Sequence, residues 1–243
     1  MPHGIPAHLD ALDLTALAVD YPFDNAVFDR FWNADERSGS SMAGAIKLIN
    51  ARAAYALAMA CSEWVVARVE REVDTLDALL RIEAGWAALA DWRYADLPSP
   101  MPIPPGDPKE YARPLRLAMR LMSRAHELCR QTSPEVNSKA LGLAMLADHV
   151  VGRHPAFEPW LWTSLRRCHK HCREIGTPMA DQPLVAREFF DPDFVWRDGA
   201  ADESLARYVR TLELCENPYL RTPAQMRADG FQGPPYGRTS FEG

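Results

Sequence analysis

The chain has 243 residues, 47% of them hydrophobic and 25% charged, which indicates a globular protein with a sizeable core and excludes a disordered chain. The net charge of -6 argues against a nucleic-acid partner, and five scattered cysteines favour free thiols in a reducing cytoplasm over a disulfide scaffold. The first ten residues lack the features of a secretory signal, and the most apolar stretch contains Lys47, Arg52 and Glu63, so we predict a cytoplasmic protein without a membrane span.

Residues 1–38 are interpreted as an acidic N-terminal arm. Residues 1–36 hold seven acids and one base, Arg30, so the whole negative excess lies here. Leucines and aromatic residues on either side of Pro22 predict two short helices, or a helix and a loop, that dock on the core. Such a segment can steer a basic protein toward it, and the alternative is a solvated acidic face. The expected partner-binding residues are Asp20, Asp24, Asp29, Asp35 and Glu36.

The stretch 42–71 predicts one long central helix, with Ser38–Ser41 as the preceding turn. Apolar residues recur at steps of three and four along one face, and the opposite face is apolar as well. A helix that is apolar on two faces has neighbours on both sides, so we expect it to be buried. The first face carries Ile46, Ile49, Ala53, Leu57, Ala60 and Trp64, the second carries Leu48, Tyr55, Met59 and Val66, and a narrow wet strip carries Arg52, Glu63 and Glu70.

A second helix is predicted to begin at Asp74 or Thr75 and to run to about Tyr94. Residues 97–108 follow as a proline-rich connection, with six prolines between residues 98 and 108. Proline lacks the amide donor and clashes with the preceding turn, so this connection is not helical. We interpret it as a stiff, extended spacer. A ligand for the proline-binding groove of another protein is the alternative.

Helical periodicity resumes over 109–131, from 133 to about 153, from 157 to 175 and again from Leu205 to Cys215. Gly176 is placed to end the third of these helices. Residues 217–243 are rich in proline and glycine and are interpreted as an irregular C-terminal tail. No stretch alternates with period two, so the prediction is an all-α fold of seven or eight helices in one domain, residues 1–243.

Two segments of the chain resemble each other. L-A-M-A-C-S-E-W-V-V-A-R at 57–68 is similar to L-A-M-L-A-D-H-V-V-G-R at 143–153 when one position is skipped, and Asn50 or Asn137 precedes each. Two related helical hairpins around the central helix, as in HEAT-like repeats, would explain the similarity. Chance similarity between two alanine-rich core helices is the alternative.

The segment Cys168-His169-Lys170-His171-Cys172 is the densest cluster of potential metal ligands. Its two cysteines lie one helical turn apart, and His126 with Cys129 offers a second pair, so zinc is a candidate. The cysteines also fall on apolar stripes, where free cysteine behaves as a small hydrophobic residue. We therefore expect no metal and no other cofactor.

The opposite face of the same helix carries Arg166, Lys170 and Arg173, which is a candidate phosphate-binding face. The alternatives are a solvated face or one paired with the acidic arm. No nucleophile elbow, phosphate-binding loop, dinucleotide fingerprint or H-E-x-x-H motif is present. Glu63, Asp148 and His149 lie on the two similar segments and form a candidate acid–base site, with a structural pair as the alternative.

The sequence favours a non-catalytic, cytoplasmic protein-binding module, such as an inhibitor, an immunity or antitoxin-type protein, or an adaptor. Its expected partner is a protein with a basic surface that contacts the acidic arm. Neither nucleic acid nor membrane is an expected partner. The alternatives are a helical enzyme or ligand-binding domain with the His/carboxylate site between hairpins, and a zinc-bound helical protein.

Overall fold

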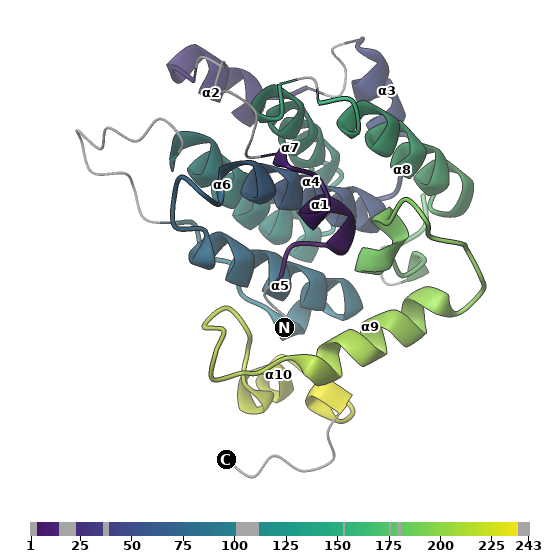
Figure 1. The fold of residues 1–243 in the computed structure, drawn as a ribbon. Coiled ribbons are helices and arrows are strands. Elements are labelled where there is room, and N and C mark those ends of the chain that lie inside the picture. Colours follow the sequence, from purple (N-terminus) through teal and green to yellow (C-terminus); the bar gives the residue numbers. More distant parts are fainter. Residues whose placement is uncertain are drawn as a thin grey trace.

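The computed structural model describes residues 4–14, 23–35, 39–100, 112–152, 154–174, 176–178 and 181–237. Within these ranges the chain forms ten α-helices and a few short 3-10 turns, and no strand (Figure 1). Eight of these α-helices are seven residues or longer. The predicted all-α fold is therefore confirmed for the described part of the chain. The predicted number of about seven or eight helices is lower than the ten observed there, because the predicted central helix is divided into two helices and one short C-terminal helix was not predicted.

The centre of the molecule is α4, which spans Ala51–Val69. It packs most extensively against α7 (Val136–Val150) and α6 (Ala112–Arg130), and less against α5 (Leu76–Ala90). Figure 1 shows α4 running through the middle of these helices. Every residue from 53 to 69 is buried, so the predicted central helix does lie inside the fold.

The stretch 42–71 is not one helix, contrary to the prediction. It forms α3 (Ser41–Lys47) and α4, separated by three residues, and the Asn50 side chain caps α4 by accepting a hydrogen bond from Ala53 N at 2.9 Å. The break turns Leu48 outward, where 49% of its surface is exposed, although it was expected on the second buried face. Tyr55, Met59 and Val66 of that face are fully buried.

Asn137 of α7 holds this break in place. Its Nδ2 donates to Ile46 O at 2.7 Å and to Ile49 O at 3.0 Å, so two carbonyls freed by the break keep hydrogen bonds. The side chain is buried, which makes these bonds more valuable than exposed ones. The N-terminal ends of α4 and α7, each marked by an asparagine, therefore lie together.

The predicted wet strip of the central helix is only partly solvated. Arg52 is half-buried and Glu70 is exposed, but Glu63 is 3% exposed. Arg68, which was not assigned to the strip, is 1% exposed. The pattern of α4 alone could not reveal this, because the residues that cover these charges come from distant parts of the chain.

The remaining helices lie around this core. α1 (Ala7–Asp10) contacts α4, and α2 (Asn25–Trp32) lies on α6 and α7. α8 (Phe157–His171) contacts α3 and the 3-10 turn η4 (Arg187–Phe190), and α9 (Ala200–Thr211) runs beside α5. α5 begins next to the predicted start but ends four residues before Tyr94, and α8 ends four residues early. α9 begins five residues before Leu205 and ends four residues before Cys215.

The C-terminal segment contains structure that the sequence analysis did not predict. α10 (Pro223–Ala228) begins with a capping box, in which the Thr222 side chain accepts from Gln225 N and the Gln225 side chain accepts from Thr222 N. Met226 and Tyr236 are fully buried, and Tyr236 OH donates to Arg221 O at 2.6 Å. The tail up to residue 237 is thus part of the packed fold. Residues 238–243 lie outside the described ranges, as do residues 101–108 of the proline-rich connection.

Candidate functional site

Three of the five acids predicted to bind a partner lie in the described part of the chain: Asp24, Asp29 and Asp35. All three are exposed, on α2 or at its ends. Asp24 caps α2, its carboxylate accepting from Val27 N at 2.8 Å. Asp20 and Glu36 lie outside the described residues.

Aromatic packing, and not charge pairing, holds α2 on the core. Phe31 is fully buried, and its ring lies 5.3 Å from that of His149. Its carbonyl oxygen approaches α7 at Gly142, where a Cβ would lie 2.4 Å from the oxygen, so only glycine permits this contact. Phe28 and Trp32 are half-buried beside it.

Basic residues of α6 and α7 contact the same segment through rings and carbonyl oxygens. Arg120 lies 4.8 Å from the Trp32 ring centroid and 5.2 Å from that of Phe28. Lys139 Nζ donates to Trp32 O at 2.7 Å, and Arg113 donates to Phe23 O at 3.1 Å. These cations stabilise α2 without using its carboxylates.

The basic face of α8 is separate from this contact. Arg166, Lys170 and Arg173 are all exposed, and Arg166 donates to Thr163 on the same helix at 2.9 Å. In the described part of the acidic arm, α1 contacts α4 and α2 contacts α6 and α7. These contacts do not support the expected alternative of an α8 face paired with the arm.

The three residues of the candidate acid–base site have different surroundings. Asp148 is exposed, and the His149 ring packs against Phe31 and Phe23. Glu63 is buried, and its Oε1 accepts from Trp86 Nε1 at 2.8 Å and from Arg187 Nε at 2.7 Å. None of the contacts described for Glu63 joins it to the other two residues.

Glu63 is instead the centre of a structural cluster. Arg187 also donates to Gly4 O at 2.6 Å, so this cluster ties the N-terminus and η4 to α4 and α5. Burial raises the pKa of Glu63, against the opposing effects of the Arg187 charge and of hydrogen bonds from Trp86 and Arg187.

The candidate zinc ligands do not form a metal site among the described residues. No three His, Cys, Asp or Glu side chains there lie close enough to share an ion. Cys168 and Cys172 are buried, and burial raises the pKa of the Cys172 thiol to about 12. His171 stacks on Trp196 with ring centroids 4.0 Å apart, and His126 Nδ1 lies 3.2 Å from Tyr55 OH.

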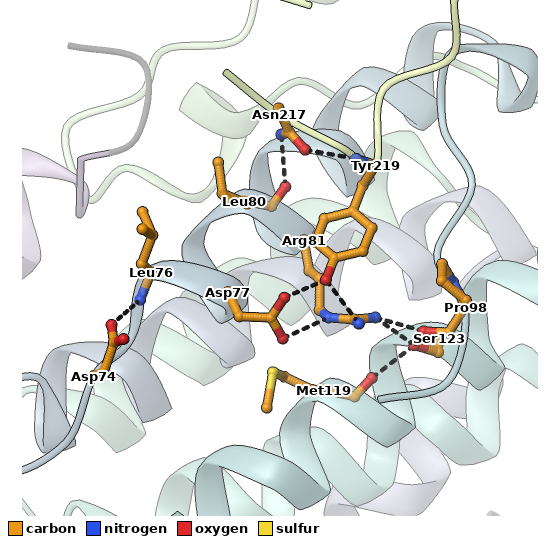
Figure 2. Close-up of polar contacts among 10 residues, drawn as sticks. All are labelled: Asp74, Leu76, Asp77, Leu80, Arg81, Pro98, Met119, Ser123, Asn217 and Tyr219. Carbon is orange, nitrogen blue, oxygen red and sulfur yellow. Dashed lines mark hydrogen bonds and ion pairs between the residues drawn. The ribbon is translucent and has the colours of Figure 1, made fainter. Parts of the chain in front are cut away.

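A second buried charge, Arg81 of α5, gathers acceptors from several segments (Figure 2). Its Nε donates to Asp77 at 3.0 Å, one terminal nitrogen donates to Pro98 O and Ser123 Oγ, and the other donates to Tyr219 OH at 2.9 Å. The Tyr219 hydroxyl also donates to Asp77, and its ring lies over the guanidinium. Asp77, Arg81 and Tyr219 also line a cavity of about 430 Å³, together with Pro100, Arg116 and Met119.

A larger cavity, of about 630 Å³, lies beside the first turn of α4 and is called the Trp92 cavity below. Its walls come from the end of α5 with the following 3-10 turn η2 (Trp92–Tyr94), from the end of α6, from the segment 181–184 and from the start of α9. Its polar lining consists of Arg52, Asp91, Trp92, Arg93, Cys129, Arg130, Thr132, Asp181, Gln182 and Asp202.

Sequence reasoning missed this cavity because no short motif marks it. Arg52, Arg93 and Arg130 belong to three elements, and only the tertiary fold brings them together. The one local signal is the pair Trp92-Arg93 directly after a helix, and two residues do not define a site. The two cavities and the acidic face of α2 are thus the candidate functional features.

The chain matches no known family model, no curated protein and no solved structure. Among the described helices, none is both long enough and apolar enough to cross a membrane. Function is therefore argued from the geometry alone.

Proposed function

We propose that the chain is a non-catalytic, cytoplasmic protein-binding module that recognises a basic protein through the acidic surface of its N-terminal arm. The surface consists of Asp24, Asp29 and Asp35, together with Asp20 and Glu36 in the adjoining sequence. An inhibitor or immunity-type protein that covers a basic surface, or an adaptor, would use such a module.

One observation carries this proposal: among the described residues, the contacts that hold α2 on the core do not use the carboxylates of Asp24 and Asp29. Arg120 and Lys139 contact ring faces and a carbonyl oxygen of the arm. Asp29 has no ion-pair partner among the described residues, and Asp24 accepts only the capping bond of its own helix. An anchored helix presents its charges at fixed positions, which reduces the entropy lost on binding. The field of such charges also raises the rate of encounter with a basic partner.

We further propose that α4 and α7 arose as repeated elements of two HEAT-like hairpins. The similarity of their sequences and the adjacent asparagines at their N-terminal ends support this. The packing of the following helices differs, since α5 lies on α4 whereas α8 contacts α3 and η4. Related sequences would test the repeat, because both asparagines and both alanine-rich cores should then align between the halves of each chain.

The binding proposal is tested with the full chain as bait in an extract of its own source cells. Captured proteins are identified by mass spectrometry, and the purified partner is then titrated against the wild type and against the variant Asp24→Lys/Asp29→Lys/Asp35→Lys. We expect a partner with a basic surface, and a loss of affinity of about tenfold or more in the variant, since each 1.4 kcal/mol is a factor of ten. Higher ionic strength should reduce the difference because exposed charges are screened.

A matched variant separates this surface from net charge. Glu72, Glu158 and Glu188 are exposed acids on other parts of the molecule, so reversing all three changes the total charge equally. The proposal predicts that this control keeps wild-type affinity. Equal losses in the two variants, or none in the α2 variant, would remove the acidic surface as the binding site.

A further inference from the structure

The Trp92 cavity has the size of a small-molecule site. Its volume of about 630 Å³ lies within the range of roughly 300–1,000 Å³ that is typical of ligand pockets. Its floor includes Ala88, Leu89 and Leu184, so an apolar body can be covered there, while charged groups stand around it. This combination of apolar surface with a few directed polar groups is the usual composition of a binding pocket.

Arg93 is held in a fixed position at this cavity. Its Nε and one terminal nitrogen donate to the two carboxylate oxygens of Asp91, at 2.8 and 2.5 Å. A guanidinium has five N–H groups in a rigid fork, and among the described residues no acceptor lies against the others of Arg93. Asp91 therefore orients the guanidinium and leaves donors for a ligand.

Trp92 and Arg130 form a flat wall next to it. The guanidinium of Arg130 lies 4.9 Å from the Trp92 ring centroid, and that of Arg93 lies 5.9 Å from the same centroid. Arg130 is exposed, and its nearest carboxylate, Asp96, is 3.8 Å away, beyond hydrogen-bond distance. Both guanidinium groups lie over the Trp92 ring, and that of Arg93 also lies 5.1 Å from the Phe231 ring centroid. A planar group that ends in a carboxylate can meet two such cations beside an aromatic surface.

Backbone strain occurs at the same wall. Thr132, just after α6, has a φ of 52°, which a β-branched residue rarely adopts. Only one other non-glycine residue in the described ranges, Tyr236, has a positive φ. Thr132 is the residue that ends α6, since Thr132 N donates to Cys129 O at 3.1 Å and Ser133 N donates to Leu128 O at 2.9 Å. This cap fixes the position of the wall next to Arg130.

The carboxylates of the cavity limit the charge of a ligand. Asp91 is paired with Arg93, and Asp181 and Asp202 are exposed at the wall formed by the segment 181–184 and α9. Arg52, half-buried in the first turn of α4, adds a third cation. The cavity is therefore lined by three arginines and three aspartates. Because its net charge is close to zero, it can bind one negative group through directed hydrogen bonds, but it disfavours a ligand with several negative charges.

We propose that the Trp92 cavity binds a small organic monoanion with a planar, largely apolar body, such as an aromatic carboxylate. The carboxylate accepts hydrogen bonds from Arg93 and Arg130, and the ring lies against Trp92 and the apolar floor. This site is separate from the acidic surface of α2, so a small anion and a basic protein would bind independently.

The test uses benzoate and indole-3-carboxylate as probes, with neutral benzamide and inorganic phosphate for comparison. Each is titrated into the full chain by NMR, and the indole N–H signal of Trp92 is assigned with the variant Trp92→Phe. Concentrations up to about 10 mM cover the millimolar affinity expected of such small fragments. We expect both carboxylates to shift the Trp92 signal with saturation, and benzamide and phosphate to bind about tenfold more weakly or not at all.

Variants then locate the carboxylate. Arg130→Gln should weaken benzoate binding by about tenfold, because it removes a charged donor. Arg130→Lys should bind benzoate with an affinity between those of Arg130→Gln and the wild type, because lysine keeps the charge but lacks the planar fork. Arg227→Gln, at an exposed arginine of α10, is the matched control and should bind as the wild type does. Arg130 is exposed, so the fold should remain, which the unfolding midpoint checks.

Three results would each overturn the proposal: no saturable shift of Trp92 by either carboxylate, equal binding of benzamide or phosphate, or equal losses in the Arg130 and Arg227 variants. Retention of benzoate binding by the Asp24/Asp29/Asp35 reversal variant is expected. Loss of binding in that variant would contradict the independence of the two sites.

Discussion

Two charged clusters contact α5, and they bury charges of opposite sign. In the first, the Glu63 side chain is 4% exposed and its partner Arg187 is 25% exposed. In the second, the Arg81 side chain is 5% exposed and its partner Asp77 is 50% exposed. Each cluster therefore consists of one buried charge and one more exposed counter-charge.

The two buried charges differ in how they can be neutralised. A carboxylate can take up a proton, and burial raises the pKa of Glu63 in that direction. A guanidinium does not lose its proton in a protein, so it must be satisfied by acceptors. Glu63 has two donors, whereas Arg81 has acceptors on α5, on α6, at Pro98 and at Tyr219. The cluster of Arg81 should therefore be less tolerant of change.

The largest effect is expected for Arg81→Met. The change removes a cation whose hydrogen bonds join four segments, and it leaves buried acceptors with fewer donors. We expect the free energy of unfolding to fall by about 3 kcal/mol or more, measured by urea denaturation. Arg81→Lys should recover little of it, since one ammonium cannot reach the same acceptors. A loss below about 1 kcal/mol for Arg81→Met would show that the cluster is not structural.

Removing the more exposed partner, Arg187 or Asp77, should change stability with a different pH dependence in each cluster. In Arg187→Gln the buried Glu63 loses the charge that lowers its pKa, so that pKa rises further. The folded variant then holds the proton more tightly than the unfolded chain does, and its stability is lost as pH rises through the folded pKa. We expect a loss of about 2–3 kcal/mol near pH 7.5 that becomes smaller near pH 5.

Asp77→Asn is the matched control for this measurement. Arg81 cannot give up its proton, so the loss caused by Asp77→Asn should be the same at both pH values. Equal pH dependence in the two variants would mean that proton uptake by Glu63 is not the difference between the clusters.

Tyr219→Phe tests how much a single hydroxyl contributes to the larger cluster. The ring remains over the Arg81 guanidinium, with the centroid 4.3 Å from its carbon, while the bonds to Arg81 and Asp77 are lost. Hydrogen bonds to charged groups contribute more than neutral ones, but Asp77 is half exposed, so we expect a loss of about 1–2 kcal/mol. An unchanged unfolding midpoint would place the contribution of Tyr219 in its ring alone.

The longer helices were predictable from the sequence because each is amphipathic or apolar over its own length. The break between α3 and α4 was missed because apolar residues continue across it, although Asn50 is a strong N-cap residue. α10 was missed in a similar way, since Thr222 and Gln225 have the spacing of a capping box. Both places therefore carried a local capping signal. The continuous apolar pattern in the first and the high proline and glycine content in the second led to the wrong prediction.

The charged clusters were not predictable, because their partners are far apart in the chain. Glu63 and Arg187 are separated by 124 positions, and Arg81 and Tyr219 by 138. Periodicity placed Glu63 on a wet strip because it reports polarity, and it carries no information on what covers a polar residue. The guanidinium groups of the Trp92 cavity were missed for the same reason.

The smallest effect is expected for Glu63→Gln, which keeps an acceptor for Trp86 Nε1 and Arg187 Nε. Because burial raises the pKa of Glu63, its contribution to stability is fully present below the unfolded pKa and is lost as pH rises through the folded pKa. Glutamine does not titrate. The free energy of unfolding of the wild type should therefore exceed that of the variant most near pH 4, and the difference should shrink to about 1 kcal/mol or less near pH 7.5. Urea denaturation across that range measures it. A difference in stability that grows toward neutral pH would mean that Arg187 and Trp86 lower the pKa of Glu63 by more than burial raises it. The ion pair would then stabilise this cluster, as it does in the Arg81 cluster.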